Sequence, residues 1–288
     1  GTGAAFQPSL SSALISRVYG GPSGRVALGT YNASGDTGKL LFTGVASLLF
    51  GAGIAWQEVV SGYAILALLV SAVLWLGLRR LRSTGAVSMS ARNPSTVAGW
   101  GIRDRSGFRW LAAIVFLDCA VQDGFLVFVA FLMIEKNIPT GLAAFAVVAT
   151  LAGGGIGKYA CGHLSARMGV VRSLILVEVF TAAGIMGVIM LPTVAVFFLL
   201  PLVGIVLQGS STITYGSVRQ FVDEARQSRG FALIYSMASG ASVAGPVGFG
   251  IISDIYSVGA AVVLMAVVTL LPLGMCMRLQ AGLNRVGQ

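Results

Sequence analysis

Residues 110–134 read WLAAIVFLDCAVQDGFLVFVAFLMI, and their only charged members are Asp118 and Asp123. The stretch is slightly longer than the roughly 20 residues that a helix needs to cross a bilayer. Counting outward from it, we find nine apolar runs, the first of them short: 2–16, 26–56, 61–78, 110–134, 141–161, 173–191, 193–216, 230–253 and 257–277. Continuous apolar runs favour helices over the alternating strands of a membrane barrel. The sequence therefore predicts an all-α, polytopic membrane protein.

The basic residues gather at every second gap between these runs. Of 19 Lys and Arg, 16 lie at alternate gaps or at the C-terminal end: Arg17, Arg25, Arg79, Arg80, Arg82, Arg92, Arg103, Arg105, Arg109, Arg167, Arg172, Arg219, Arg226, Arg229, Arg278 and Arg285. Lys136 alone lies in a gap of the other set. Because cytoplasmic loops retain positive charge, we expect these arginines and the C-terminus in the cytoplasm. The expected location is a bacterial cytoplasmic (inner) membrane.

Composition excludes several classes of protein. With 56% hydrophobic residues, 10% charged residues and a mean hydropathy of +0.87, an ordinary soluble domain could not be solvated. The net charge of +9 follows from the cytoplasmic loops, and no basic stretch carries the interleaved aromatics that stack on bases, so we expect no nucleic-acid partner. One histidine and three scattered cysteines predict neither a metal site nor a cofactor.

A short pattern occurs twice in the same order. Residues 27–35, ALGTYNASG, and residues 232–240, ALIYSMASG, agree at five of nine positions. Upstream of each copy lies a second match, in which Gly3, Gln7 and Ser9 recur as Gly204, Gln208 and Ser210. Both copies run in the same direction across the membrane, which indicates the parallel repeat of a two-halved transporter.

Three further runs precede the second copy and none precedes the first. On this basis we expect a truncated protein of six plus six helices, which resembles the major facilitator superfamily of secondary transporters. The resemblance implies helices four (partial) to twelve of that fold. It divides the chain into a remnant N-terminal half at 1–78, a cytoplasmic link at 79–108 and a C-terminal half at 109–288.

Two motifs bear on the resemblance. Residues 162–172, GHLSARMGVVR, look like the superfamily's loop signature between helices eight and nine, which Gly162, Leu164, Arg167, Gly169 and Arg172 fit. Ala166 stands where the family has an acidic residue, so the charge relay assigned to that acid is absent or displaced. A tight turn flanked by cytoplasmic arginines explains Gly169 and the charges equally well.

The penultimate run resembles the family's glycine and proline pattern through Gly240, Gly245, Pro246, Gly248 and Gly250. Glycines allow close helix approach and proline loosens the backbone ladder, so this helix can bend. Ordinary enrichment of both residues in membrane helices is the alternative. The family's pairing of helices five and eight implies a similar approach of Gly153, Gly154, Gly155 and Gly157 to Gly35 and Gly38.

Ionisable residues within apolar runs are the candidate functional residues, because each costs on the order of 3 kcal/mol at mid-membrane. Asp118 and Asp123 lie about 14 and 21 Å from Arg109, and being five apart they point to different sides of the helix. Gln122 can hydrogen-bond Asp118. We expect the two aspartates to couple transport to protons or to contact solute, or else to pair with Lys39 or Lys158 across helices.

The remaining candidates are weaker. Asp36 and Lys39 lie about 16 and 21 Å deep and can pair on one helix face. Lys158 and Glu178 are candidate interhelical charges. Gln7 and Gln208, at equivalent places in the two copies, are candidate solute contacts or interhelical hydrogen-bond partners.

These features predict a monomeric secondary active transporter that alternates between inward-open and outward-open states, with a small solute and protons as its partners in the lipid bilayer. The glycine and proline pattern favours efflux of a solute or drug by antiport. A proton-coupled uptake permease is the closest alternative, and a non-transporting membrane scaffold is another. No nucleophile elbow, histidine pair or carboxylate cluster indicates an enzyme.

Overall fold

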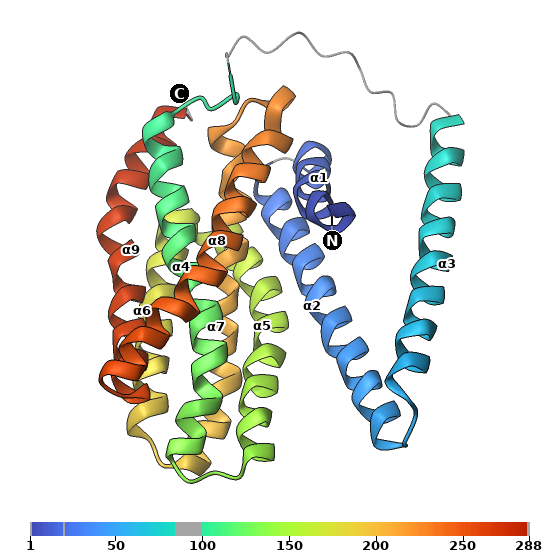
Figure 1. Cartoon of the computed structure of the whole chain (residues 1–288). Coiled ribbons are helices and arrows are strands. Elements are labelled where there is room, and N and C mark those ends of the chain that lie inside the picture. Colours follow the sequence, from blue (N-terminus) through green and yellow to red (C-terminus); the bar gives the residue numbers. More distant parts are fainter. Residues whose placement is uncertain (1, 20, 84–98, 287–288) are drawn as a thin grey trace. The chain divides into compact units, whose positions relative to one another are not determined.

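The computed structural model describes residues 2–19, 21–83 and 99–286. These residues form long α-helices and no strand, with one isolated bridge between Ile102 and Val222. The helices are α1 (Thr2–Val18), α2 (Gly21–Gly51), α3 (Trp56–Ser83), α4 (Arg105–Glu135), α5 (Thr140–Met168), α6 (Val170–Met190), α7 (Thr193–Phe221), the short η1 (Glu224–Arg226), α8 (Gln227–Ile255) and α9 (Val258–Val286) (Figure 1). Each predicted apolar run lies within one long helix to within a residue, except that the run 26–56 extends past the end of α2 at Gly51.

Six helices of the described residues are long and apolar enough to cross a membrane: α3, α4, α6, α7, α8 and α9. Their lengths and hydropathies are those of an integral membrane protein, as the sequence predicts. The twelve-helix layout stays a prediction.

The chain divides into two compact units. One comprises α1, α2 as far as Thr37, and α4 to α9; the other comprises the rest of α2 and α3. In the second unit the hydroxyl of Tyr63 donates to the carbonyl oxygen of Phe42 at 2.7 Å, and the two rings meet edge to face. The predicted division at residues 78 and 109 stays a prediction, since 84–98 lie outside the described residues.

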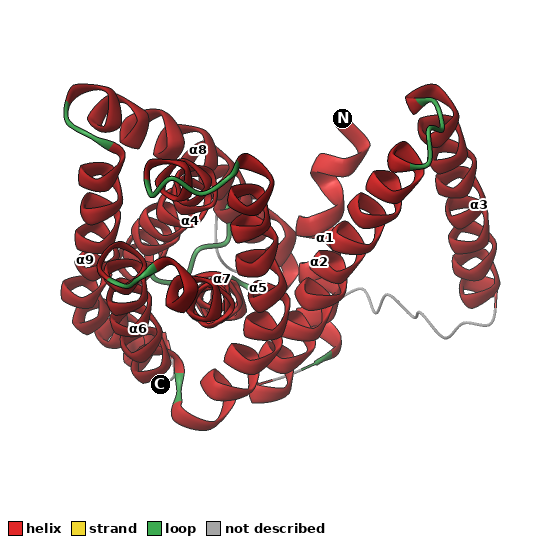
Figure 2. Ribbon diagram, turned by 90° about the horizontal axis from the view of Figure 1, so that it is seen from below, coloured by secondary structure: helices red, strands yellow, loops and turns green. Residues whose placement is uncertain are grey.

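Helices α4 to α9 form an antiparallel bundle in which α5 and α7 lie side by side (Figure 2). Glycines bring the two backbones into contact: a Cβ atom on Gly153 would lie 1.9 Å from the carbonyl oxygen of Pro201, and one on Gly157 would lie 2.0 Å from that of Ile205. The predicted approach of these glycines to Gly35 is therefore wrong, and a Cβ on Gly35 would meet no atom within 4 Å. The face of α5 that carries Gly153 and Gly157 packs on α7, where the two backbones are too close for a side chain.

The helix ends that carry Arg105, Arg167, Arg172, Arg219 and Arg285 all lie at one end of the bundle, which we call the arginine-rich end. Asp104 organises it by accepting a hydrogen bond from the backbone N–H of Ser106 at 2.9 Å as the N-cap of α4. The same carboxylate pairs with Arg285 of α9 at 3.0 Å. The alternate gaps that the sequence marks with arginine thus meet in space.

Lys136 has a structural role at the opposite end of the bundle. Its ammonium donates three hydrogen bonds of 2.8 to 3.0 Å to carbonyl oxygens at the end of α6, those of Val188, Ile189 and Leu191. Burial lowers the pKa of this ammonium. A cation at a helix C-terminus neutralises carbonyls that have no partner within the helix, so Lys136 ties the end of α4 to the end of α6.

Candidate functional site

A buried polar network joins α4 to α7 in the interior of the bundle. Ser210 Oγ lies 2.8 and 2.7 Å from the two carboxylate oxygens of Asp118, and it accepts a hydrogen bond from Gln122 Nε2 at 3.1 Å. Asp118 and Gln122 are 6% and 9% exposed. Asp118 follows the first residue of α4 by 13 positions, which places it about 20 Å along the helix. Asp118 and Gln122, the predicted partners, thus share the hydroxyl of Ser210, a residue of another helix.

The network has more acceptors than one hydroxyl can serve. Ser210 Oγ is also 3.0 Å from the carbonyl oxygen of Leu207. A serine has a single O–H donor and two acceptor lone pairs. If Asp118 is protonated, it donates to Ser210 and the serine donates to Leu207; if it is charged, the serine donates to the carboxylate. Both protonation states of Asp118 fit the same heavy-atom positions. They differ in the proton on Asp118 and in the direction in which the hydroxyl of Ser210 points.

The two aspartates of α4 have different surroundings, as their spacing predicts. Asp118 is buried and Asp123 is half-buried. Among the ion pairs of the described residues, none includes either aspartate. Removing a carboxylate from water is costly unless a cation or hydrogen bonds compensate, and for Asp118 the compensation comes from Ser210.

Lys158 of α5 forms an ion pair with Asp36 of α2 at 2.5 Å, and both side chains are largely buried. Beside this pair the backbones approach closely, because a Cβ on Gly29 would lie 2.6 Å from the carbonyl oxygen of Lys158 and 3.4 Å from the Cα of Gly162. Gly29 is thus the glycine of α2 that allows close backbone approach to α5. The side chain of Lys39, predicted to pair with Asp36 on the same helix, lies outside the described residues.

Glu178 of α6 is 1% exposed, so it is buried inside the bundle. Its neighbours Leu174 and Val177 belong to the apolar cluster that fills the arginine-rich end of the bundle. One carboxyl oxygen of Glu178 has no hydrogen-bond partner among the described residues, and none of their ion pairs includes it.

The two glutamines predicted to be equivalent have different surroundings. Gln7 is exposed and donates to the hydroxyl of Tyr31 at 3.0 Å. Gln208 is 6% exposed and its side chain lies against Gly154, with Nε2 unpartnered among the described residues.

A row of hydroxyl and thiol groups extends from the Asp118 network toward α1. Cys119 lies 3.7 Å from the hydroxyl of Tyr215, whose ring packs 4.8 Å from that of Tyr235. The hydroxyls of Tyr235 and Ser12 are 2.9 Å apart. Sequence reasoning missed Ser210 and this row. The signal available for Ser210 is the run QGSSTIT at 208–214, an unusual density of polar residues within an apolar span.

The predicted loop signature forms the junction of α5 and α6. Gly169 has φ +85°, in the region that glycine adopts without strain, and it lets α6 begin directly after α5 ends. Leu164 packs against the bundle core, and Arg167 and Arg172 are exposed. The motif therefore forms a tight turn between the two helices.

The glycine and proline pattern of α8 serves close approach at one position. A Cβ on Gly245 would lie 2.4 Å from the carbonyl oxygen of Ala120, so α8 touches the backbone of α4 there. Gly240 and Gly248 are exposed, and a Cβ on either would meet nothing within 4 Å. A Cβ on Gly250 would lie 4.0 Å from the ring of Phe128, an ordinary van der Waals contact. Pro246 lies inside α8, which continues without interruption to Ile255.

The described residues contain no group of three or more His, Cys, Asp or Glu side chains placed to hold a metal ion. The cysteines Cys119, Cys161 and Cys276 are free and buried. In comparisons with known proteins, no family model matches the chain and no curated protein matches it.

Proposed function

We propose that the chain belongs to a secondary active transporter in which Asp118 carries the coupling proton. The observation that carries the proposal is the buried Asp118–Ser210–Gln122 network, which holds an acid in the interior of a membrane helix bundle without a cation among the described ion pairs. Ionisable groups inside membrane helices are costly and mark ion pathways.

The hydrogen bond between Ser210 and Asp118 links the protonation of Asp118 to the contact between α4 and α7. When Asp118 is charged, a charge-assisted hydrogen bond worth about 1.5–3 kcal/mol links α4 to α7; when it is neutral, the bond is worth about 0.5–1.5 kcal/mol. Binding or loss of the proton therefore changes the strength of one contact between two helices of the bundle. A transporter needs such a difference to bias one conformation over the other.

A second feature supports alternating access. Close to the arginine-rich end α1 and α2 contact the bundle through Ser12 with Tyr235, through Arg219, which donates to the carbonyl oxygen of Tyr19 at 2.8 Å, and through Gly29. The Asp36–Lys158 pair follows further along α2. In the proposal these contacts close one side of the protein and break when it opens. The major facilitator resemblance, the cytoplasmic place of the arginine-rich end and efflux as the direction belong to this proposal, and uptake remains the alternative direction.

The test uses proteoliposomes with an imposed pH gradient and a panel of lipophilic cationic dyes such as ethidium. Asp118→Asn keeps the shape and removes the proton, so we expect gradient-driven dye movement to be lost. Asp254→Asn, the same change at an exposed position of α8, is the matched control and should behave as wild type. Infrared spectra supply a readout that needs no solute, since the Asp118 component of the C=O band of protonated carboxyl groups should be lost in Asp118→Asn, while any component from the buried Glu178 stays.

Gradient-driven dye movement that is equal in wild type and Asp118→Asn would refute the role of Asp118. An unchanged carboxyl band in the same variant would show that Asp118 binds no proton. Absence of movement for every dye in the wild type, with the infrared band present, would favour a non-transporting scaffold.

A further inference from the structure

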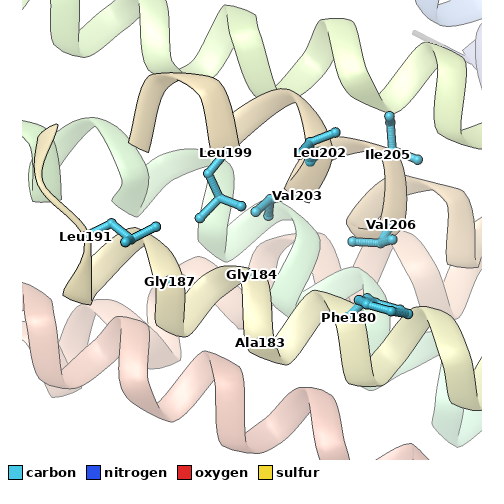
Figure 3. A pocket seen from close by; sticks show the side chains of 10 residues that line it. All are labelled: Phe180, Ala183, Gly184, Gly187, Leu191, Leu199, Leu202, Val203, Ile205 and Val206. Atoms are coloured by element: carbon cyan, nitrogen blue, oxygen red, sulfur yellow. The ribbon is translucent and has the colours of Figure 1, made fainter. Parts of the chain in front are cut away.

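A groove with a volume of about 490 Å³ lies between α6 and α7, away from the Asp118 network. Figure 3 shows the side chains of Phe180, Leu191, Leu199 and Val206 around it, with Gly184 and Gly187 on its α6 wall. All ten residues that line it are apolar or glycine. The groove therefore offers no partner to a polar or charged ligand.

Small residues on α6 create the groove. Ala183, Gly184 and Gly187 leave a shallow wall, which larger side chains on both helices surround. A Cβ on Gly184 would lie 2.7 Å from a methyl group of Val203, and one on Gly187 would lie 2.8 Å from a methyl group of Leu199. At these two glycines α6 packs closely against side chains of α7, so the groove between the helices is a fixed part of the bundle.

The groove lies on the outer surface of the membrane-spanning helices. Its rim residues Phe180 and Leu202 are 57% and 59% exposed, and Leu191 at its far end is 40% exposed. The outward side of α6 beyond Arg172 carries no charge, since the only other ionisable residue of the helix, Glu178, is buried. In a bilayer this surface meets hydrocarbon.

The dimensions of the groove select its occupant. From Phe180 to Leu191 the helix rises about 16 Å, close to the roughly 15 Å thickness of one leaflet of the hydrocarbon core. A volume of about 490 Å³ over that length gives a cross-section of about 30 Å², whereas a helix about 10 Å wide has a cross-section of about 80 Å². A neighbouring helix, including one from a second copy, is too wide to enter.

We propose that the groove is a binding site for one acyl chain of a phospholipid, from the leaflet opposite the arginine-rich end. The occupant is narrow, flexible and apolar, and it reaches the site from the bilayer without leaving hydrocarbon. This site does not depend on transport, and it gives the bundle a specific lipid contact on its outer surface.

The test is photolabelling in nanodiscs of palmitoyl-oleoyl phosphatidylcholine that contain a trace of the same lipid with a diazirine in its acyl chain. After illumination, the label is mapped by mass spectrometry of peptides. We expect the groove residues to be the most strongly labelled part of α4 to α9. Ala183→Trp fills the groove from α6 and Val206→Trp fills it from α7, and in both the groove label should fall to the level found on the outer face of α9.

Val267→Trp is the matched control. Val267 is 52% exposed on α9 and lies about 14 Å from the start of that helix, and Ala183 lies about 12 Å from Leu191, so the two positions have similar depths. The control should leave the groove label unchanged. Label spread evenly over the exposed faces of the bundle, or equal groove labelling in wild type and both filling variants, would overturn the proposal. Groove label that is present in nanodiscs holding one copy and lost in nanodiscs holding two would do so too, because it would show a second copy at the site.

Discussion

The Asp36–Lys158 ion pair should be strongly non-additive when its two residues are changed. Both side chains are largely inaccessible, at 12% and 15% exposure, and the charged atoms are 2.5 Å apart. Removing one partner of such a pair leaves the other charge buried, at a cost of about 3–5 kcal/mol. Replacing both charges removes the attraction and the desolvation penalty together, which makes the net cost small.

The assay is thermal unfolding in detergent of the wild type, Asp36→Asn, Lys158→Gln and the double variant. With a cost of about 1 kcal/mol lowering Tm by about 2–4 °C in a protein of comparable size, each single variant should lose on the order of 10 °C. The double variant should recover most of that loss. Additive losses in the double variant would refute the argument, because they would show that the two charges stabilise the protein independently.

Three further predictions concern stability and use the same assay. Gly153→Ala should destabilise by several kcal/mol, because its Cβ would lie 1.9 Å from a backbone carbonyl of α7, whereas Gly155→Ala, with no atom within 4 Å, should be tolerated; equal losses would contradict the close packing. Gly169→Ala should cost about 1–3 kcal/mol because φ is +85° and ψ is 166° there, a region adopted essentially by glycine alone, and a neutral result would mean that the turn rearranges. Lys136→Met should cost about 1.5–3 kcal/mol through the lost cap of α6, and unchanged stability would show that water replaces the ammonium.

Helix positions could be predicted from the sequence because hydrophobicity is a local property of the chain. A run such as 173–191 must be helical if it is to cross a bilayer, since only a helix satisfies its backbone groups within itself. The alternation of arginine-bearing gaps likewise predicts which helix ends meet, and α4 to α9 follow it. The spacing of Asp118 and Asp123 predicts their different surroundings from helix geometry alone.

Partners between helices could not be predicted, because a residue's own helix does not determine which neighbour it faces. The glycines of α5 gave no sign that their partner is α7 rather than α2, and Ser210 could be recognised as the partner of Asp118 only after α4 and α7 were packed. Glu178 shows the same limit: its distance along the chain from Arg172 indicates depth in the membrane, but its burial depends on the helices around it.

By itself, the sequence determined that this chain is a helical membrane protein, roughly where its helices lie and which of its acids lie within apolar spans, because these follow from the cost of exposing polar groups to hydrocarbon. The tertiary structure alone decided that Asp36 pairs with Lys158, that Ser210 contacts Asp118, and that an apolar groove lies between α6 and α7. Each of these depends on the rotation of one helix about its axis relative to the next, and that rotation is set by the packing of side chains from residues far apart in the chain.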